Sequence, residues 1–326
     1  MRILLAFVLS GLAACAPVRA PAPLPGQPLA EDVALLRGRF VAGTQPDGNT
    51  LMLRGRDGWI VIDSGRHAEH TGRIVAAVAG SGLPLRAIVN THWHLDHVAG
   101  NAALREAHPH AQVWASPEIE RALDGFLADY RRQLDALLAK PPADGAQAQA
   151  LREERARLDT GPRLLPTHPI TAGGERTMAG RRVVFGVEAD AVSGGDVWLF
   201  DPGSGVLAAG DLVTLPVPLL DTACAEGWRA ALARLDAVPF TTLVPGHGAP
   251  LDRVGFARYR GAFDRLLACA AGDGDARACN EQWLRDVDGL VAAEDVALAR
   301  SLLDYYVPHV LRAPPERRAR FCRSSG

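Results

Sequence analysis

Three histidines and one aspartate stand within six positions of the segment "THWHLDH", as His92, His94, Asp96 and His97. The chain of 326 residues has only 10 histidines, so this segment holds a large share of them. Neutral imidazole and carboxylate groups are natural ligands of zinc where thiolates are absent. Burying four such groups side by side is costly unless a shared partner such as a cation satisfies them. The cluster therefore predicts a metal site, and zinc is the ion we expect.

The spacing within this cluster predicts two neighbouring binding points. His92, His94 and Asp96 alternate, so their side chains project to the same side of an extended segment. His97 follows directly, where "VAGNAALREA" takes on a helical pattern. A change from strand to helix there would direct Asp96 and His97 toward a second, adjacent point. We therefore expect one or two ions per chain.

Four motifs, in this order, resemble those of the metallo-β-lactamase superfamily. "THWHLDH" is similar to its HxHxDH signature, and supporting matches extend from about residue 36 to 250. Asp63 in "VIDSG" matches an aspartate that supports the metal site from behind its ligands. Asp211 in "LAAGDLV" matches the carboxylate that bridges two metals in the glyoxalase-like branches, and His247 in "LVPGHG" matches a ligand of the second metal.

The resemblance implies a fold, a ligand set and a catalytic residue. The fold is of the α/β class, a four-layer αββα sandwich with a dinuclear metal site at one edge. Asp96 also orients the attacking water in this family. The implied first site takes His92, His94 and Asp211, and the second takes Asp96, His97, Asp211 and His247.

One expected histidine is missing. The family usually carries it in a turn similar to "GHTxGD", as a third ligand of the first metal. Here the turn reads "EADAVSGGDVWLFDP", and alignment on Gly195 and Asp196 places Val192 at the histidine position. Either Asp190 replaces the missing ligand, or the first site relies on water or partial vacancy. We therefore expect the second site to bind metal more tightly.

These features predict a metal-dependent hydrolase that attacks an ester, thioester, amide, lactone or lactam carbonyl with a metal-bound hydroxide. Asp211 favours the glyoxalase-like, lactonase or esterase branches, because lactamases of this fold usually carry cysteine or serine there. The alternative is a catalytically weak or inactive metal-binding lipoprotein that binds a ligand or a periplasmic partner. Val192 is the feature that favours this alternative.

The composition is that of a globular protein, with 48% apolar and 22% charged residues and a net charge of −2. Nucleic acid is not expected as a partner, because phosphate binding needs a clustered basic surface. For the same reason phosphodiester hydrolysis is less expected than carbonyl chemistry. We expect a small-molecule substrate, and the sequence leaves the oligomeric state open.

The N-terminal segment predicts export. The apolar run from Ile3 to Ala14 is too short to span a membrane and suits a signal peptide. It ends in "LAAC", which resembles a bacterial lipobox, so we expect residues 1–15 to form a signal peptide with lipid attachment at Cys15. Ala16 after this cysteine suits a periplasmic location at the outer membrane. The alternative is ordinary cleavage after "VRA", which ends at Ala20.

The rest of the chain divides into three predicted parts. Residues 16–35 are rich in proline and alanine and predict a tether. Residues 36–250 alternate strands with helices and predict the metallo-β-lactamase-like domain, interrupted by a helical insert of two amphipathic helices at about 116–157. Residues 251–326 predict a helical C-terminal extension. The insert and the extension are expected to wall the pocket or to form a dimer contact.

An exported protein meets an oxidising compartment, where disulfides persist. Cys224, Cys269, Cys279 and Cys322 allow three pairings, which sequence cannot distinguish. We prefer a local bridge between Cys269 and Cys279, which flank the loop "AAGDGDARA". Trp93 is expected to point away from the metal into packing. The remaining histidines are expected to be solvated or capping residues: His67, His70, His108, His110, His168 and His309.

Overall fold

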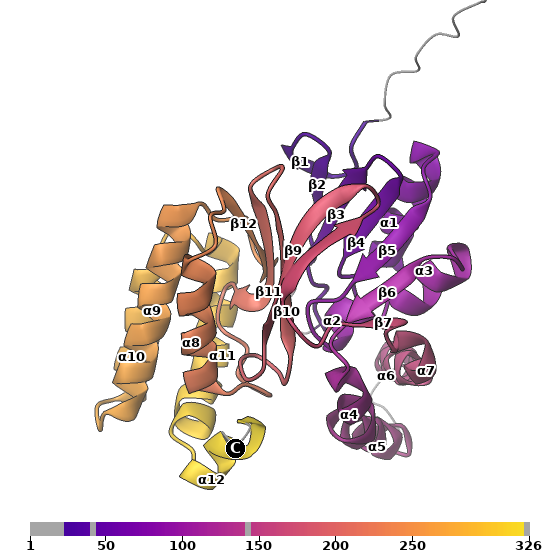
Figure 1. Ribbon diagram of the computed structural model, residues 1–326. Coiled ribbons are helices and arrows are strands. Elements are labelled where there is room, and N and C mark those ends of the chain that lie inside the picture. The colour runs from indigo at the N-terminus through magenta and orange to yellow at the C-terminus, as the bar shows by residue number, and fades with distance from the viewer. Residues whose placement is uncertain (1–22, 40–43, 141–144, 323–326) are drawn as a thin grey trace, which may run out of the picture.

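Two β-sheets lie face to face between layers of helices in the computed structural model, which describes residues 23–39, 44–140 and 145–322 (Figure 1). One sheet has seven strands in the order β1-β2-β3-β4-β5-β6-β7, and the other has five in the order β12-β11-β10-β9-β8. The predicted four-layer αββα sandwich, with its helical insert and helical C-terminal part, is confirmed. The predicted signal peptide and Cys15 lie outside the described residues.

The first sheet starts earlier than the sequence predicted. Strand β1 (Gln27–Ala30) pairs antiparallel with β2 (Val33–Leu36), within the segment expected to be a tether. All four residues of β2 are buried, and β1 lies at the sheet edge, where a proline such as Pro28 is tolerated. The described residues 37–39, which follow β2, are not in a strand.

The other strands of this sheet lead toward the metal-ligand motif. The antiparallel strands β3 (Thr50–Gly55) and β4 (Gly58–Ile62) are followed by β5 (Leu85–Val89), β6 (Gln112–Ala115) and β7 (His168–Pro169), which continue in parallel from β4. Strand β4 is buried along its whole length, as expected of a strand covered on both faces.

The second sheet supplies the other half of the core. It contains β8 (Gly174–Met178), β9 (Arg181–Glu188), β10 (Asp196–Asp201), β11 (Val206–Thr214) and β12 (Thr242–His247). Its strands are antiparallel except for β11 and β12, which run parallel and therefore end at the same edge. Apolar side chains of both sheets meet between them, among them Leu51, Ile60, Phe185, Val197 and Ala208.

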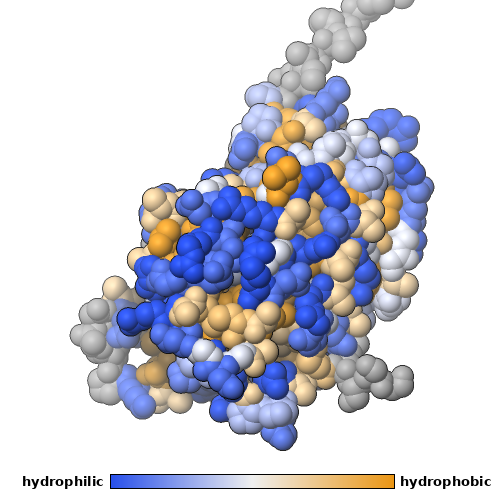
Figure 2. Space-filling view, turned by 90° about the vertical axis from the view of Figure 1, so that its left-hand side faces the viewer, coloured by the Kyte–Doolittle hydropathy of each residue, from blue (hydrophilic) through white to orange (hydrophobic). Residues whose placement is uncertain are grey.

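Helices cover the outer faces of both sheets (Figure 1). Helices α1 (Ala68–Ser81) and α3 (Asn101–Ala107) pack on the first sheet. The second sheet is covered by α8 (Ala225–Asp236), α9 (Arg253–Ala271), α10 (Ala276–Asp286) and α11 (Val296–Tyr306). Figure 2 shows this second helical face, which is largely hydrophilic across its middle. Arginines of α9 form ion pairs there with carboxylates of α8 and α10.

The insert forms a helical group beside the first sheet. It consists of α4 (Glu118–Asp124), α5 (Phe126–Leu138), α6 (Gly145–Leu158) and α7 (Gly161–Leu164). The first of the two predicted helices is therefore interrupted, at Gly125, whose φ of −109° and ψ of −101° are not helical. Apolar residues of the insert pack against Trp93 and Leu95, next to the ligand motif.

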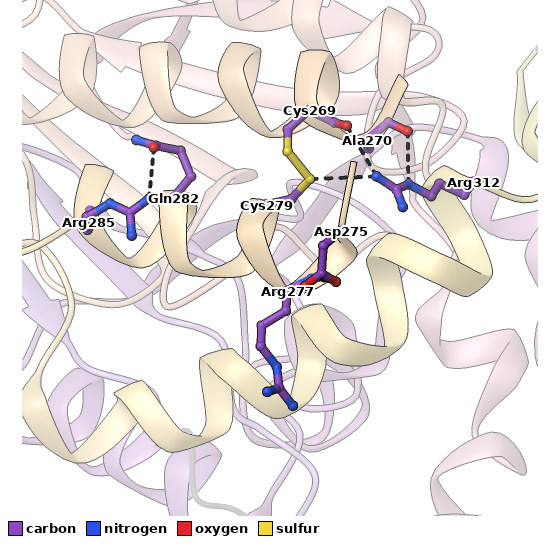
Figure 3. The surroundings of a disulfide bond; sticks show 8 residues. All are labelled: Cys269, Ala270, Asp275, Arg277, Cys279, Gln282, Arg285 and Arg312. Carbon is purple, nitrogen blue, oxygen red and sulfur yellow. Dashed lines mark hydrogen bonds between the residues drawn. A yellow bond between two sulfur atoms is a disulfide. The ribbon is translucent and has the colours of Figure 1, made fainter. Parts of the chain in front are cut away.

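Two disulfides hold the C-terminal helices. The preferred bridge between Cys269 of α9 and Cys279 of α10 is confirmed, and Arg312 donates hydrogen bonds to the carbonyls of Cys269 and Ala270 beside it (Figure 3). The other bridge joins Cys224, just before α8, to Cys322 at the end of the described chain. Among the helices of the described residues, none has the length and apolarity needed to cross a membrane.

Candidate metal centre

The predicted ligands come from four places in the fold and meet at one edge of the two sheets. His92 and His94 follow strand β5, and Asp96 and His97 lie in the short helix α2 (Leu95–Val98). Asp211 lies within β11, and His247 is the last residue of β12. Residues separated by up to 155 positions are therefore brought to one place.

The side chains form two groups in which the possible ligand atoms lie within 4.8 Å of one another. One group is His92, His94 and Asp211, and the other is Asp96, His97 and His247. Asp211 faces both groups: its Oδ2 lies 3.7 Å from His92 Nε2, and its Oδ1 lies 3.3 Å from His97 Nε2. The same Oδ1 lies 3.5 Å from His247 Nε2. The grouping expected from the sequence is the one that the structure brings together.

Asp63 orients the imidazole of His97. Its Oδ2 lies 2.7 Å from His97 Nδ1, so this nitrogen donates its proton to Asp63, and the ring is held with Nε2 toward Asp96 and Asp211. Asp63 itself has φ of 61°, a conformation uncommon outside glycine that tends to occur at functional sites. The backbone N–H and the hydroxyl of Thr91 both donate to its carboxylate and hold it there.

Thr91 orients the imidazole of His92 in the same manner. The Thr91 hydroxyl donates its single proton to Asp63 at 2.8 Å and lies 3.1 Å from His92 Nδ1. The hydroxyl oxygen must therefore accept from His92 Nδ1–H. His92 Nε2 is left with its lone pair on the side of Asp211.

Thr222 orients the imidazole of His94, and sequence analysis did not identify it. Its hydroxyl donates to the carbonyl of Val192 at 2.9 Å and lies 2.8 Å from His94 Nε2. Because the only proton of this hydroxyl goes to Val192, its oxygen must accept a hydrogen bond from His94 Nε2–H. The nitrogen of His94 that is free to bind a metal is therefore Nδ1. Nothing in the segment "LLDTACAEGW" signals this role, since Thr222 is 128 residues from His94.

The site has the unsatisfied atoms that a cation would satisfy. The Nε2 atoms of His92 and His97 and both carboxylate oxygens of Asp211 are buried and have no hydrogen-bond partner. Buried polar groups in this condition are costly, by roughly 1–3 kcal/mol each and more when charged. A donor set of imidazoles and carboxylates with converging lone pairs suits a divalent metal ion. The residues therefore fit one or two metal ions.

Burial and neighbouring charges shift the pKa values of the ligand residues. Burial, with the neighbouring His97 and His94, holds the pKa of His92 well below its usual range, so the ring is neutral. Burial alone would raise the pKa of Asp96, but His97 and His247 hold it well below its usual range. Burial opposes a charge on His97, yet Asp211, Asp63 and Asp96 together raise its pKa. Without a cation, a proton on His97 takes its place between the carboxylates.

Two glycines lie so close to the ligand residues that any side chain at their positions would clash with them. A methyl group at Gly246 would lie 1.9 Å from Asp211 Oδ1, and one at Gly48 would lie 2.6 Å from His97 Cε1. Asn49 fixes the loop around His247, because its side-chain amide donates to the carbonyls of Pro245 and Gly248. Gly246, the first glycine of "PGHG", is thus required by close packing against Asp211.

Val192 and Asp190 bear on the missing family histidine. Val192 is fully buried in the apolar core that the second sheet forms with the C-terminal helices. Asp190 belongs to neither ligand group. This arrangement favours the alternative in which the first site has only His92, His94 and Asp211 as protein ligands.

A buried ion pair stands behind Asp96. The guanidinium of Arg66 donates to both carboxylate oxygens of Glu154, at 3.3 and 2.7 Å, and its Nη1 lies 3.9 Å from Asp96 Oδ1. Glu154 belongs to helix α6 of the insert, so the insert is connected to the metal centre through Arg66. Sequence analysis missed both residues, because a single arginine and a single glutamate carry no signal of pairing.

The histidines expected to be solvated or capping lie outside both ligand groups. His70 is a correction, because it is only 2% exposed. Its Nε2 is 2.8 Å from the Thr50 hydroxyl, and Arg73 approaches its Nδ1 at 2.8 Å. His67 precedes helix α1, where its Nδ1 lies 2.9 Å from the buried carboxylate of Asp47, and His108 follows helix α3. Trp93 is buried in packing as predicted, here against the insert, but its ring also meets that of His94 edge-on at 4.6 Å.

A sequence model described as the metallo-beta-lactamase superfamily matches residues 43–247. The chain belongs to the metallo-β-lactamase superfamily. Solved structures with a similar fold include a metallo-beta-lactamase from Pontibacter korlensis, with 17% identity, a TM-score of 0.56, and coverage of 74% of this chain and 99% of that one. A metallo-beta-lactamase family protein from Thermus thermophilus has 19% identity and a TM-score of 0.53, with 85% and 94% covered.

Two hydrolases are similar in sequence. A linear primary-alkylsulfatase of Pseudomonas sp. (strain ATCC 19151) is 24% identical over 219 residues, which cover 62% of this chain and 41% of the alkylsulfatase. A hydroxyacylglutathione hydrolase of Thermosynechococcus vestitus is 49% identical over 45 residues, 14% of this chain and 18% of the hydrolase. The matches thus span less than half the length of each relative.

Proposed function

We propose that the protein is a zinc-dependent hydrolase that acts on an ester, thioester, lactone or lactam carbonyl. The observation that carries this proposal is the orientation of three imidazoles. Partners that are not ligands hold His92, His94 and His97 so that each directs one ring nitrogen toward the carboxylates of Asp96 or Asp211. A purely structural cluster has no need of such lone pairs converging in a buried place.

Each residue has a role that follows from its position. His92, His94 and Asp211 would hold one ion, and Asp96, His97, His247 and Asp211 the other. When bound, such ions supply Lewis acidity and lower the pKa of water to about 7. Asp96 is ionised, so its carboxylate could accept a hydrogen bond from the attacking water and orient it. It would take the proton that this water loses and then pass the same proton to the leaving group.

The choice of a carbonyl substrate rests on Asp211. A carboxylate at this bridging position favours the glyoxalase-like, lactonase or esterase branches over lactamases. The similarity to a hydroxyacylglutathione hydrolase supports an acyl substrate, whereas the similarity to an alkylsulfatase makes a sulfate ester the competitor. The alkylsulfatase match covers more of the chain, so the carbonyl proposal depends on the carboxylate of Asp211 and on the shorter match.

The test is a substrate panel with the metal content measured alongside. Zinc-loaded protein should hydrolyse at least one ester, thioester, lactone or lactam, and Asp96→Asn should lower kcat by roughly 10²–10⁴-fold. Asp124→Asn, a change on the insert away from the ligand groups, serves as the control and should leave kcat unchanged. Turnover of alkyl sulfate alone would contradict the carbonyl proposal. Bound metal without any turnover would favour the metal-binding lipoprotein.

We also propose that the protein is exported and held at the outer membrane, on its periplasmic side, by a lipid on Cys15. Two disulfides support an oxidising compartment. Cys15→Ala should release the protein into the soluble periplasmic fraction. Membrane association that is unchanged in this variant would contradict the anchor.

A further inference from the structure

A pocket of about 340 Å³ opens beside His94 and Asp96. Small-molecule sites typically measure roughly 300–1,000 Å³ and combine a mostly apolar lining with a few polar groups. Here the polar lining includes the two ligand-type residues, so a molecule in the pocket lies against the metal centre. The apolar lining includes Trp93, Phe126, Leu127 and Leu219.

The insert supplies one apolar wall of this pocket. Phe126, at the start of α5, is 39% exposed, and its ring lies 5.5 Å from that of Trp93. The large apolar side chains that are exposed among the described residues are Phe126, Leu137, Val254 and Tyr305, and of these Phe126 alone lines the pocket. Leu219, in the segment between β11 and α8, lines the same pocket from a different part of the chain.

The charged residues that line the pocket already have partners. The Nε and Nη2 of Arg66 are taken by Glu154, which also accepts from the hydroxyl of Tyr130. The carboxylate of Asp221 accepts a hydrogen bond from Tyr306. Arg66 therefore does not present the Nε and Nη2 fork to an anionic substrate group, and most of the lining that remains for recognition is apolar.

We propose that this pocket binds an alkyl chain of the substrate next to the bond that is cleaved. The inference rests on the proposed hydrolase function, since it places the reacting end of the molecule at His94 and Asp96. It adds the class of substrate: an ester or thioester with an extended apolar group, in preference to a small or highly charged one.

Linear carboxylates test the pocket without requiring turnover. Acetate, butyrate, hexanoate and octanoate place a carboxylate at the metal centre and differ only in chain length. Calorimetry with the zinc-loaded full chain should show a Kd that falls by up to roughly fourfold for each methylene that is buried. Phe126→Ala and Leu219→Ala should each reduce the gain in affinity per methylene. Leu137→Ala, which alters an exposed apolar residue elsewhere on α5, should keep it.

The outcomes separate this inference from the proposed function. A Kd that does not change with chain length, or a gain that persists in both pocket variants, would overturn the inference. A chain-length gain that either pocket variant reduces supports it, even if the substrate panel shows no hydrolysis. Hydrolysis without any chain-length gain would leave the proposed function intact and reject the pocket. Because Phe126 and Leu219 lie on different walls, misfolding of one variant leaves the other as the test.

Discussion

The imidazoles of His92, His94 and His97 each hold one ring nitrogen in a hydrogen bond and direct the other toward a carboxylate. Asp63 was implied by the family resemblance, but Thr222 was not. Thr222 matters because the first site has the poorer set of ligands. A ring that can rotate is a weaker ligand, since its orientation must be fixed at the moment of binding.

Thr222→Val should therefore weaken metal binding at the first site by roughly 10–100-fold, which is typical when a partner behind a ligand is lost. Valine keeps the shape of threonine but removes the acceptor for His94 Nε2–H. Titration with zinc, followed by calorimetry, should show one weakened site and one unchanged site. Thr222→Ser keeps the hydroxyl and is the control. Equal weakening of both sites would mean that the variant acts through general loss of structure.

His70 should make the stability of the protein depend on pH. Burial lowers its pKa to about 4 from 6.5, with Asp47 opposing and Arg73 adding to the effect. Above pH 6.5 the ring is neutral in both the folded and the unfolded chain. Between pH 6.5 and 4 only the unfolded chain binds the proton, so the free energy of unfolding falls by roughly 3 kcal/mol as the pH falls.

His70→Gln should remove that part of the pH dependence, as measured by urea unfolding at pH 7, 5.5 and 4. The variant at the exposed His110, His110→Gln, is the control. Metal release in acid affects both variants alike, so their difference isolates His70. If both variants lose the same stability between pH 7 and 4, the buried neutral ring is not the cause.

At the scale of elements, the insert is attached to the domain by both apolar packing and charge. Helix α6 has few buried residues, and they are Ala148, Glu154 and Leu158. Glu154 accepts hydrogen bonds from Arg66, Tyr130 and Arg157. Arg157 lies in α6 itself, so the carboxylate connects this helix with Tyr130 of α5 and with Arg66 of the domain. Burial and Glu154 raise the pKa of Tyr130 to about 12, which keeps its hydroxyl a donor.

Glu154→Ala should destabilise the protein by about 3–5 kcal/mol, because it leaves Arg66 as a buried charge without its main partner. Thermal unfolding measures the loss, and limited proteolysis should detect cleavage within the insert before the domain unfolds. Glu153→Ala changes the exposed neighbour on the same helix and should have little effect. Resistance of the insert to proteolysis in Glu154→Ala would show that apolar packing alone holds it.

At the scale of the whole molecule, the C-terminal helices are part of the core rather than an appendage. Trp228, Phe256, Tyr259 and Trp283 are buried against the second sheet. The bridge from Cys224 to Cys322 closes a segment of 98 residues, whereas the bridge from Cys269 to Cys279 closes one of 10. In the chain-entropy account, a longer closed loop removes more freedom from the unfolded chain.

Replacing Cys224 and Cys322 by serine should therefore cost about 4–5 kcal/mol, more than the roughly 3 kcal/mol for the same change at Cys269 and Cys279. Thermal unfolding of the two double variants under identical conditions provides the comparison. A larger loss for the short loop would mean that local packing around Cys269 and Cys279, with Arg312 beside them, outweighs loop entropy.

The local features of this protein follow from short segments of its sequence. Apolar runs lead into the motifs of Asp63, Asp211 and His247, and these runs form β4, β11 and β12, because a buried strand needs a continuous apolar sequence. The ligand residues were identified because they belong to short motifs. The insert and the C-terminal helices were found from amphipathic spacing, with errors at Gly125 and at the first strands, where propensity is weak and pairing decides.

The residues that support the motifs are known only from the folded chain. The partners Thr222 and His94 are 128 residues apart, and Arg66 and Glu154 are 88 apart. A single hydroxyl or carboxylate has no periodicity, and its partner depends on which chain segments the fold places side by side. For the same reason the pocket formed by Trp93, the insert and Leu219 exists only once the layers are assembled, since its walls come from separate parts of the chain.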